Sequence, residues 1–239
     1  MKFDYIKKFD MSEDRKRYIE KVLLTKQFYR NEDDIIVSEE YPENEQNSNS
    51  ENNFDKNGFG IDKNRRHYTI IKKLCKQYYP FPKQVLEVGA GTGYFAKIFI
   101  DKFIPQKYAV YEFSKSFKII RKKFKEERRT KVVIHNKSFK DLSSKELEQY
   151  DCVIALEVLE HINWDREFLS KIKPGTWVFI SVPRIHGYNH VRAFLTPDSI
   201  AYRYRDILKI HEIKEVKRSI NFKSKHNYPL IWAAACKKI

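Results

Sequence analysis

The chain has 239 residues, of which 41% are hydrophobic and 33% charged, and its formal net charge is +15. This length suits one large domain with extensions, and an aromatic content of 15% excludes a wholly disordered chain. No run approaches the roughly 18 apolar residues of a membrane span, and the charged start Met1–Lys8 is unlike a signal peptide. We therefore expect a soluble, cytoplasmic protein.

The N-terminal quarter of the chain predicts a helix followed by a loop. An amphipathic pattern begins at Ser12, a suitable N-cap, and continues to Tyr29. We expect residues 1–39 to form a helical extension that acts as a lid. Residues 40–57 include a stretch without any apolar side chain, which predicts a flexible polar loop. The main domain is then expected to occupy residues 58–239.

Beyond residue 65, helical and strand-like patterns alternate. Helices are expected at 65–79, 93–103, 115–129, 164–171 and 197–208, and strands at 85–89, 108–112, 132–135, 151–156 and 176–182. Alternation of this kind implies parallel pairing with right-handed crossovers, so the pattern predicts an open α/β sheet. The last two strand candidates, 209–217 and 229–237, have no helix between them and are expected to pair as a hairpin at the sheet edge.

Three of the seven glycines fall within five residues, at Gly89, Gly91 and Gly93, between a predicted strand and a predicted helix. Glycine tolerates positive φ and lets a ligand approach the main chain, and open α/β sheets bind ligands at this crevice. A dinucleotide-binding fingerprint would need a third glycine at position 94, where Tyr94 stands, so its spacing does not match. A P-loop would end in Gly-Lys-Ser/Thr, which is not present here. Glu112, at the end of the next strand, can accept hydrogen bonds from ribose hydroxyls.

The spacing E-x-G-x-G-x-G resembles that of the class I S-adenosylmethionine (SAM) methyltransferase superfamily. The resemblance is strongest in VLEVGAGTGYFAKIF (85–99), AVYEFS (109–114), YDCVIALEVLEHI (150–162) and HVRAFLTPDSI (190–200). Within these strings, ALEVLEHI and HVRAFLTPDSI are similar to ubiquinone-pathway and metabolite O-methyltransferases. The resemblance implies a Rossmann-like α/β fold. Its sheet would have seven mostly parallel strands, with the final strand inserted antiparallel in an edge hairpin.

The same resemblance implies SAM as the cofactor. The implied cofactor-binding residues are Glu87, Gly89, Ala90, Gly91, Gly93, Glu112, Phe113, Ser138, Phe139, Leu156 and Glu157. The glycines would wrap the methionine part, Glu112 would hold the ribose, and the backbone after Leu156 would line the sulfonium. Many relatives carry Asp near the adenine amino group. Here Ser138 or the backbone would have to contact the adenine amino group instead, and Phe139 is expected to pack on the face of the adenine.

Methyl transfer from SAM is an in-line attack, so the protein must align the acceptor and, for a hydroxyl, remove its proton. His161 follows the strand that faces the sulfonium and is the best candidate for this base. A helical turn would place Glu157, Glu160 and His161 on one face. This string is similar to an ExxEH segment associated with metal in some relatives, and His186 and His190 could add a ligand. We expect no metal and keep this cluster as the alternative.

Three functions are compatible with these observations. The leading hypothesis is a SAM-dependent methyltransferase acting on a small-molecule acceptor, at oxygen. The alternative is a methyltransferase of RNA or another nucleic acid, favoured by the charge of +15 and by the metal-type string. A third is an inactive scaffold subunit with the SAM fold, which we rank last because such subunits usually lose the glycine cluster.

Overall fold

The computed structural model describes residues 28–30, 35–38, 66–114, 116–184, 190–194, 196–217 and 229–239. Seven strands of these ranges form one sheet in the order β5-β4-β3-β6-β7-β10-β9. They are β3 (Gln84–Val88), β4 (Lys107–Tyr111), β5 (Lys131–His135), β6 (Cys152–Leu156), β7 (Trp177–Pro183), β9 (Leu208–Lys217) and β10 (Pro229–Lys238). Strand β10 is antiparallel to both of its neighbours, whereas β5, β4, β3, β6 and β7 run parallel. The predicted fold class is confirmed.

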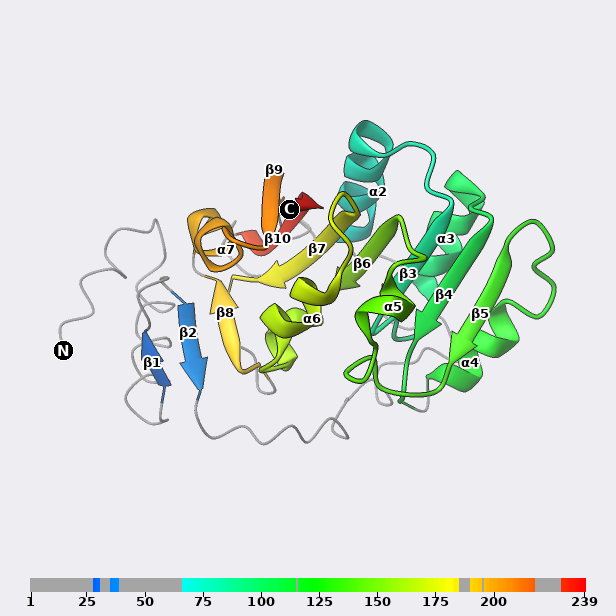
Figure 1. Cartoon of the computed structure of the whole chain (residues 1–239), viewed down its shortest axis with the longest axis horizontal. Coiled ribbons are helices and arrows are strands. Elements are labelled where there is room, and N and C mark those ends of the chain that lie inside the picture. Colours follow the sequence, from blue (N-terminus) through cyan, green and yellow to red (C-terminus); the bar gives the residue numbers. More distant parts are fainter. Residues whose placement is uncertain are drawn as a thin grey trace, which may run out of the picture.

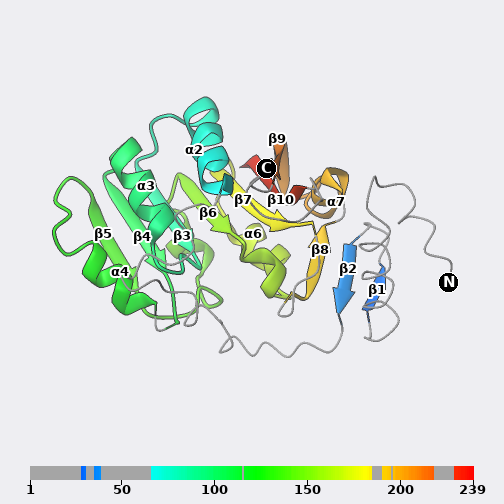
Figure 2. The same cartoon turned by 180° about the vertical axis from the view of Figure 1, so that it is seen from behind.

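Helices cover both faces of this sheet (Figures 1 and 2). One face carries α2 (Arg66–Tyr78), α3 (Tyr94–Phe103) and α4 (Phe117–Lys123), and the other carries α5 (Ser144–Leu147), α6 (Asp165–Lys171) and α7 (Pro197–Arg203). Side chains of β4 alternate between the two resulting cores. Tyr108 and Val110 pack with the first helices, and Ala109 and Tyr111 face the second group. Burial on both faces explains why these strands are almost continuously apolar.

Two helices are shorter than the sequence predicts. Helix α4 ends at Lys123 instead of continuing to residue 129, because no apolar side chain between Phe124 and Thr130 can pack on the sheet. Helix α7 ends at Arg203, and the chain then turns into β9 at Leu208. Most stability of a protein helix comes from packing of its apolar face, so the charged segment after Phe124 does not extend α4.

A second, three-stranded antiparallel sheet contains β1 (Phe28–Arg30), β2 (Ile35–Ser38) and β8 (Arg192–Phe194), with β2 in the middle. The predicted helix is therefore wrong at its C-terminal end, where pairing with β2 replaces local helical preference. Strand β8 has three residues, too few for a pattern of alternation. The rest of the expected N-terminal helix and the expected polar loop 40–57 lie outside the described residues.

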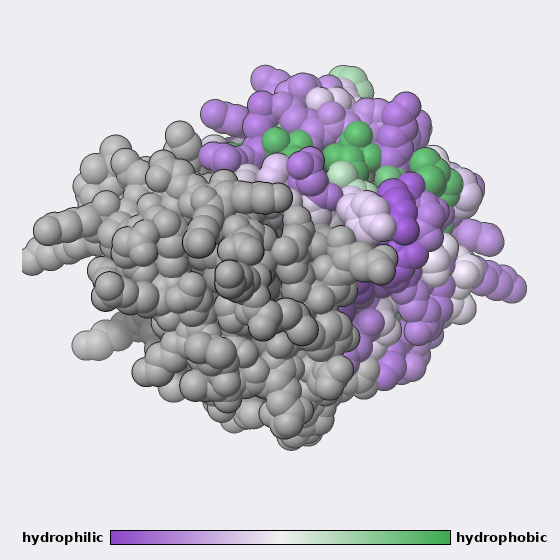
Figure 3. Space-filling model, turned by 90° about the vertical axis from the view of Figure 1, so that its left-hand side faces the viewer, coloured by the Kyte–Doolittle hydropathy of each residue, from purple (hydrophilic) through white to green (hydrophobic). Residues whose placement is uncertain are grey.

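Over the described residues, the surface seen in Figure 3 is largely hydrophilic, with separate apolar groups near its upper edge. The described part of the chain contains no helix with the length and apolar character needed to cross a membrane.

Candidate active site

The turn from β3 to α3 contains the three clustered glycines, and all three have positive φ, at 64°, 53° and 68° for Gly89, Gly91 and Gly93. The surroundings of Gly89 and Gly91 show that glycine is needed at the two positions for different reasons. A Cβ on Gly89 would lie 2.5 Å from Cγ2 of Val158, so this glycine permits close packing. A Cβ on Gly91, by contrast, would meet no atom within 4 Å among the residues that the structure describes, its chain neighbours aside. The backbone at Gly91 therefore borders open space, as a ligand cradle requires.

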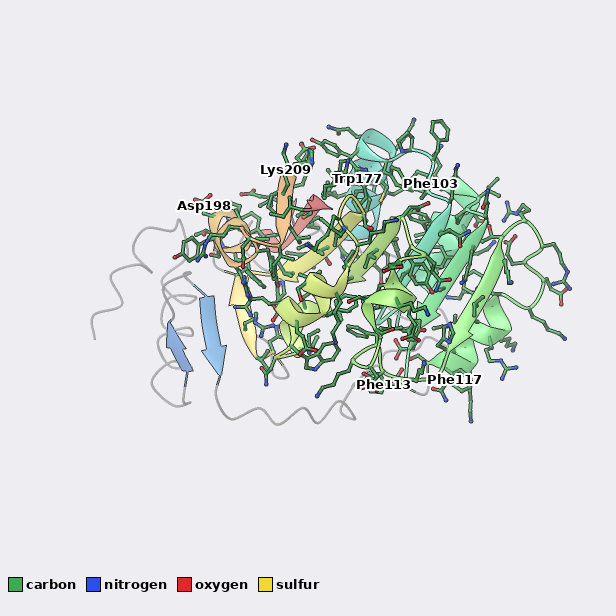
Figure 4. The ribbon with its side chains drawn as sticks, in the orientation of Figure 1. Phe103, Phe113, Phe117, Trp177, Asp198 and Lys209 are labelled. Carbon is green, nitrogen blue, oxygen red and sulfur yellow. The ribbon has the colours of Figure 1, made fainter. Side chains whose placement is uncertain are left out.

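Glu112 lies beside this turn, at the carboxyl end of β4. Its Oε2 accepts a hydrogen bond from Gly91 N at 2.7 Å, and its Oε1 accepts one from Ser114 N at 2.9 Å. Each carboxylate oxygen has a second lone pair, so both can still accept from a ligand hydroxyl. The next residue, Phe113, is 40% exposed and lies where the strands end, on the opposite side of the sheet from Trp177 at the start of β7 (Figure 4). The carboxyl ends of β3 and β4 thus bring these groups together.

Glu87 belongs to the core below the turn. Its Oε2 accepts a 2.8 Å hydrogen bond from the hydroxyl of Tyr108 on β4, and its side chain is buried. Burial raises the pKa of Glu87 to about 8. The sequence predicts Glu87 as a cofactor-binding residue. In this position the side chain supports the turn from within, and any contact with a ligand stays a prediction.

The two residues expected near the adenine, Ser138 and Phe139, differ in how far they are buried. The ring of Phe139 is only 4% exposed and packs against Trp164 and Phe168, with ring centroids 4.8 and 4.9 Å apart. This burial leaves little ring surface for the expected packing on adenine. Ser138 is half-buried, and its hydroxyl accepts a hydrogen bond from Lys140 N at 3.2 Å. Of the predicted aromatic residues, Phe113 has the more exposed ring.

Strand β6 ends at Leu156, and the following residue, Glu157, has φ of +56°. A non-glycine residue in this region is uncommon and is typical of functional or strained sites. Bonds to Ser181 on β7 hold it there: Glu157 N donates to Ser181 O at 3.0 Å, and Glu157 Oε1 accepts from Ser181 Oγ at 2.8 Å. The expected helical turn begins only afterwards, as the 3₁₀ helix η4 (Leu159–His161).

A cluster of possible metal-ligating side chains lies at η4. It consists of Glu160 and His161 of η4 together with His190, and their ligand-type atoms all lie within 4.8 Å of one another. Oε1 of the fully buried Glu160 lies 3.8 Å from Nε2 of His161, whose side chain is 40% exposed. The rings of His161 and His190 meet edge to face at 4.7 Å. Sequence reasoning grouped Glu157 with this set, but its carboxylate is bonded to Ser181. His186 lies outside the described residues.

This cluster offers the donor types of a divalent metal site, one carboxylate and two imidazoles. Donors about 2.0–2.2 Å from a shared zinc ion can be at most about 4.4 Å apart, and the 3.8 Å between Glu160 Oε1 and His161 Nε2 lies within this span. The same pair also suits a base that is supported by a neighbouring carboxylate.

Sequence reasoning missed two buried charges behind the cluster. Asp165, at the start of α6, is fully buried and accepts from Arg203 and from the Tyr204 hydroxyl. Arg192 on β8 is 3% exposed, and its Nη2 lies 3.3 Å from Asp165 Oδ1. The available signal was an arginine inside the otherwise apolar run 191–194, because buried arginines are almost always paired.

A family model described as a methyltransferase domain matches residues 62–227, more than half of the chain. No curated protein matches the sequence of this chain significantly. Among solved structures, the N-methyltransferase NodS from Bradyrhizobium japonicum WM9, in complex with S-adenosyl-L-homocysteine, is similar at 14% identity and a TM-score of 0.60. That match covers 79% of this chain and 96% of NodS.

Two other solved structures share the fold. The 1,6-didemethyltoxoflavin-N1-methyltransferase of Burkholderia thailandensis, with bound 1,6-didemethyltoxoflavin and S-adenosylhomocysteine, is 14% identical with a TM-score of 0.57, covering 76% of this chain and 82% of that one. The [4+2]-cyclase SpnF is 11% identical with a TM-score of 0.54, covering 72% and 81%. The cyclase shows that this fold alone does not specify a reaction.

Proposed function

This chain belongs to the family of methyltransferase domains, and we propose that it transfers a methyl group from SAM to an oxygen of a small-molecule acceptor. Two structurally similar proteins contain bound S-adenosylhomocysteine, the product that SAM leaves behind. The observation that carries the proposal is the glycine turn. Its open backbone at Gly91 lies directly beside the carboxylate of Glu112.

The residues around this turn fit the parts of SAM. The open space at Gly91 accommodates a ligand against the main chain, and Glu112 retains acceptor capacity for ribose hydroxyls. Phe113 offers an exposed ring beside the same strand end. Leu156 ends the adjacent strand β6 and Glu157 follows it, so the backbone here can line the reacting end of the cofactor.

When bound, SAM supplies an electrophilic methyl group. The chain must then hold the acceptor in line with that methyl and receive the proton of an acceptor hydroxyl. His161 is the candidate base, because its partly exposed imidazole lies just beyond the end of β6. Glu160, 3.8 Å from His161 Nε2, would stabilise the imidazolium that forms.

Oxygen is proposed as the acceptor atom because of this base. NodS and the toxoflavin enzyme are named as N-methyltransferases, and a neutral amine can attack before it loses a proton. A hydroxyl is a poor nucleophile until its proton is removed, so a histidine beside a carboxylate favours oxygen. The N-terminal extension, through its strands β1 and β2 next to β8, is proposed to close over the acceptor.

The atom to which the transferred methyl group is bonded in the product tests this proposal. SAM with a ¹³C-labelled methyl group is incubated with the protein and a small-molecule extract, and the labelled product is examined by carbon NMR. A methyl carbon bonded to oxygen supports the proposal. A methyl carbon bonded to nitrogen, sulfur or carbon contradicts the acceptor atom while leaving the methyl transfer itself established.

A further inference from the structure

We propose that Arg192 is a positioning residue for His161, and that it acts by clamping η4 from the neighbouring strand β8. This inference rests on the proposed function, in which His161 serves as the base. Arg192 does not touch the imidazole. It holds the short backbone segment that carries Glu160 and His161.

The contacts of β8 with η4 support this role. Nη1 of Arg192 donates to the carbonyl oxygens of both Leu159 and Ile162, the latter at 2.6 Å. One residue earlier, the amide of Val191 donates to Glu160 O at 2.7 Å. A three-residue 3₁₀ helix has few hydrogen bonds of its own, so its orientation depends on such outside donors.

The guanidinium of Arg192 is fixed from its other side by Asp165. This buried carboxylate lies 3.3 Å from Arg192 Nη2. It also accepts two 2.8 Å hydrogen bonds from Arg203 and one of 2.8 Å from the Tyr204 hydroxyl. Because guanidinium is planar with five donors, it can bond two carbonyls and a carboxylate at once. Lysine has a single charged nitrogen and cannot reproduce this arrangement.

Electrostatics adds to the geometric argument. Burial lowers the pKa of Arg192, whereas the carboxylates of Asp165 and Glu160 raise it. Arg192 therefore lies close enough to Glu160 for their charges to interact.

The second imidazole of the cluster comes from the residues just before β8. His190 precedes Arg192 by two residues, and its ring meets that of His161 at 4.7 Å. Strand β8 itself pairs with β2, where Val37 lies opposite Arg192. The segment from His190 to Arg192 thus supplies the second imidazole, holds η4 and joins strand β2 to the site.

The test compares Arg192→Lys with Arg203→Lys. The side chain of Arg203 also hydrogen-bonds Asp165, and it makes no hydrogen bond to η4 among the described residues. Both variants should lose thermal stability, and both should bind S-adenosylhomocysteine within about twofold of the wild type. In ¹⁵N-detected NMR, the imidazole signals of His161 should shift and broaden only in Arg192→Lys. Label transfer from SAM into extract should fall about 100-fold in Arg192→Lys, the loss expected for misplacement by about 1 Å.

Unchanged His161 signals in Arg192→Lys, or equal changes in both variants, would contradict the proposal that Arg192 positions His161 through η4. If Arg192→Lys does not fold, Arg192→Gln provides the same comparison, because its amide can donate to one of the two carbonyls. Failure of the proposed function gives a different result. In that case the wild type transfers no label, while the NMR comparison still decides whether Arg192 positions His161.

Discussion

The amide of Gly91 donates a 2.7 Å hydrogen bond to Oε2 of Glu112, which joins the end of strand β3 to the end of strand β4. The bond fixes the glycine turn and orients the carboxylate at the same time. Both groups belong to the proposed cofactor site. Changes at either residue should therefore alter cofactor affinity before they alter the fold.

Replacing Gly91 with leucine should abolish binding of S-adenosylhomocysteine. The side chain would enter the open space at this position, where a Cβ would meet no atom of the described residues within 4 Å, its chain neighbours aside. We expect affinity to fall at least about 100-fold, or about 2.7 kcal/mol. Calorimetric titration measures this loss.

Gly175→Leu is the matched control, because Gly175 also has positive φ, at +88°, and open space around it, but lies in the turn before β7. Both substitutions should lower the free energy of unfolding by about 1–2 kcal/mol through left-handed backbone strain. Equal cofactor affinity in the two variants would show that the turn is not the binding site.

Glu112→Gln should remove recognition of the ribose hydroxyls. An amide has one acceptor oxygen in place of two, and the bonds from Gly91 N and Ser114 N compete for it. The wild type should prefer S-adenosylhomocysteine to its 2′-deoxy analogue by about tenfold, or about 1.4 kcal/mol. In Glu112→Gln this preference should disappear in the same titrations. A preference that survives the substitution would place the ribose elsewhere.

The sheet could be predicted from the sequence because its determinants are local and repeated. Apolar strands, amphipathic helices and a glycine turn each leave a pattern, and parallel pairing follows from the alternation of strands with helices. The seven strands with the last one inserted antiparallel were implied by the family resemblance. Gly91 and Glu112 were predicted together for this reason, since both follow strands that run parallel. The structure brings them into direct contact.

The acceptor side was harder to predict because its contacts join distant segments. His190 reaches His161 across about 30 residues of chain, and Arg192 reaches η4 from a strand of only three residues. Glu157 was grouped with Glu160 by helical spacing, but the chain is helical only from Leu159 onward. Short elements give no periodic signal, and buried polar pairs follow from tertiary packing.

Glu87 should make stability fall as pH rises. Its pKa is raised by burial to about 8 in the folded protein, against an ordinary value of 4.5. The folded state therefore binds a proton that the unfolded state releases, and its stabilising effect is lost between about pH 4.5 and 8. The slope can reach about 1.4 kcal/mol per pH unit.

Urea unfolding at several pH values tests this prediction. The difference in stability between Glu87→Gln and the wild type should grow in favour of the variant as pH increases. Glu148→Gln, at an exposed position, is the control and should follow the wild type. Carboxyl groups with lowered pKa, such as Glu127 at about 2, change stability only below this range. Parallel curves for Glu87→Gln and the wild type would contradict a buried, protonated Glu87.

His161→Ala should reduce methyl transfer by about 10²–10⁴-fold, as expected for loss of a general base. Its affinity for S-adenosylhomocysteine should remain unchanged, because the imidazole is placed on the acceptor side. A chelator should leave the wild-type rate unchanged. Inhibition by chelator, reversed by added Mn²⁺ or Zn²⁺, would instead assign Glu160, His161 and His190 as metal ligands.

The most direct test of the central claim is transfer of a tritiated methyl group from SAM into a cell extract that is then separated into small-molecule, RNA and protein fractions. The wild type should label the small-molecule fraction, and Gly91→Leu should label none. Label that enters RNase-sensitive material would contradict the proposed acceptor and favour a nucleic-acid methyltransferase. Binding of SAM without label in any fraction would contradict methyl transfer to a component of that extract and favour the scaffold hypothesis.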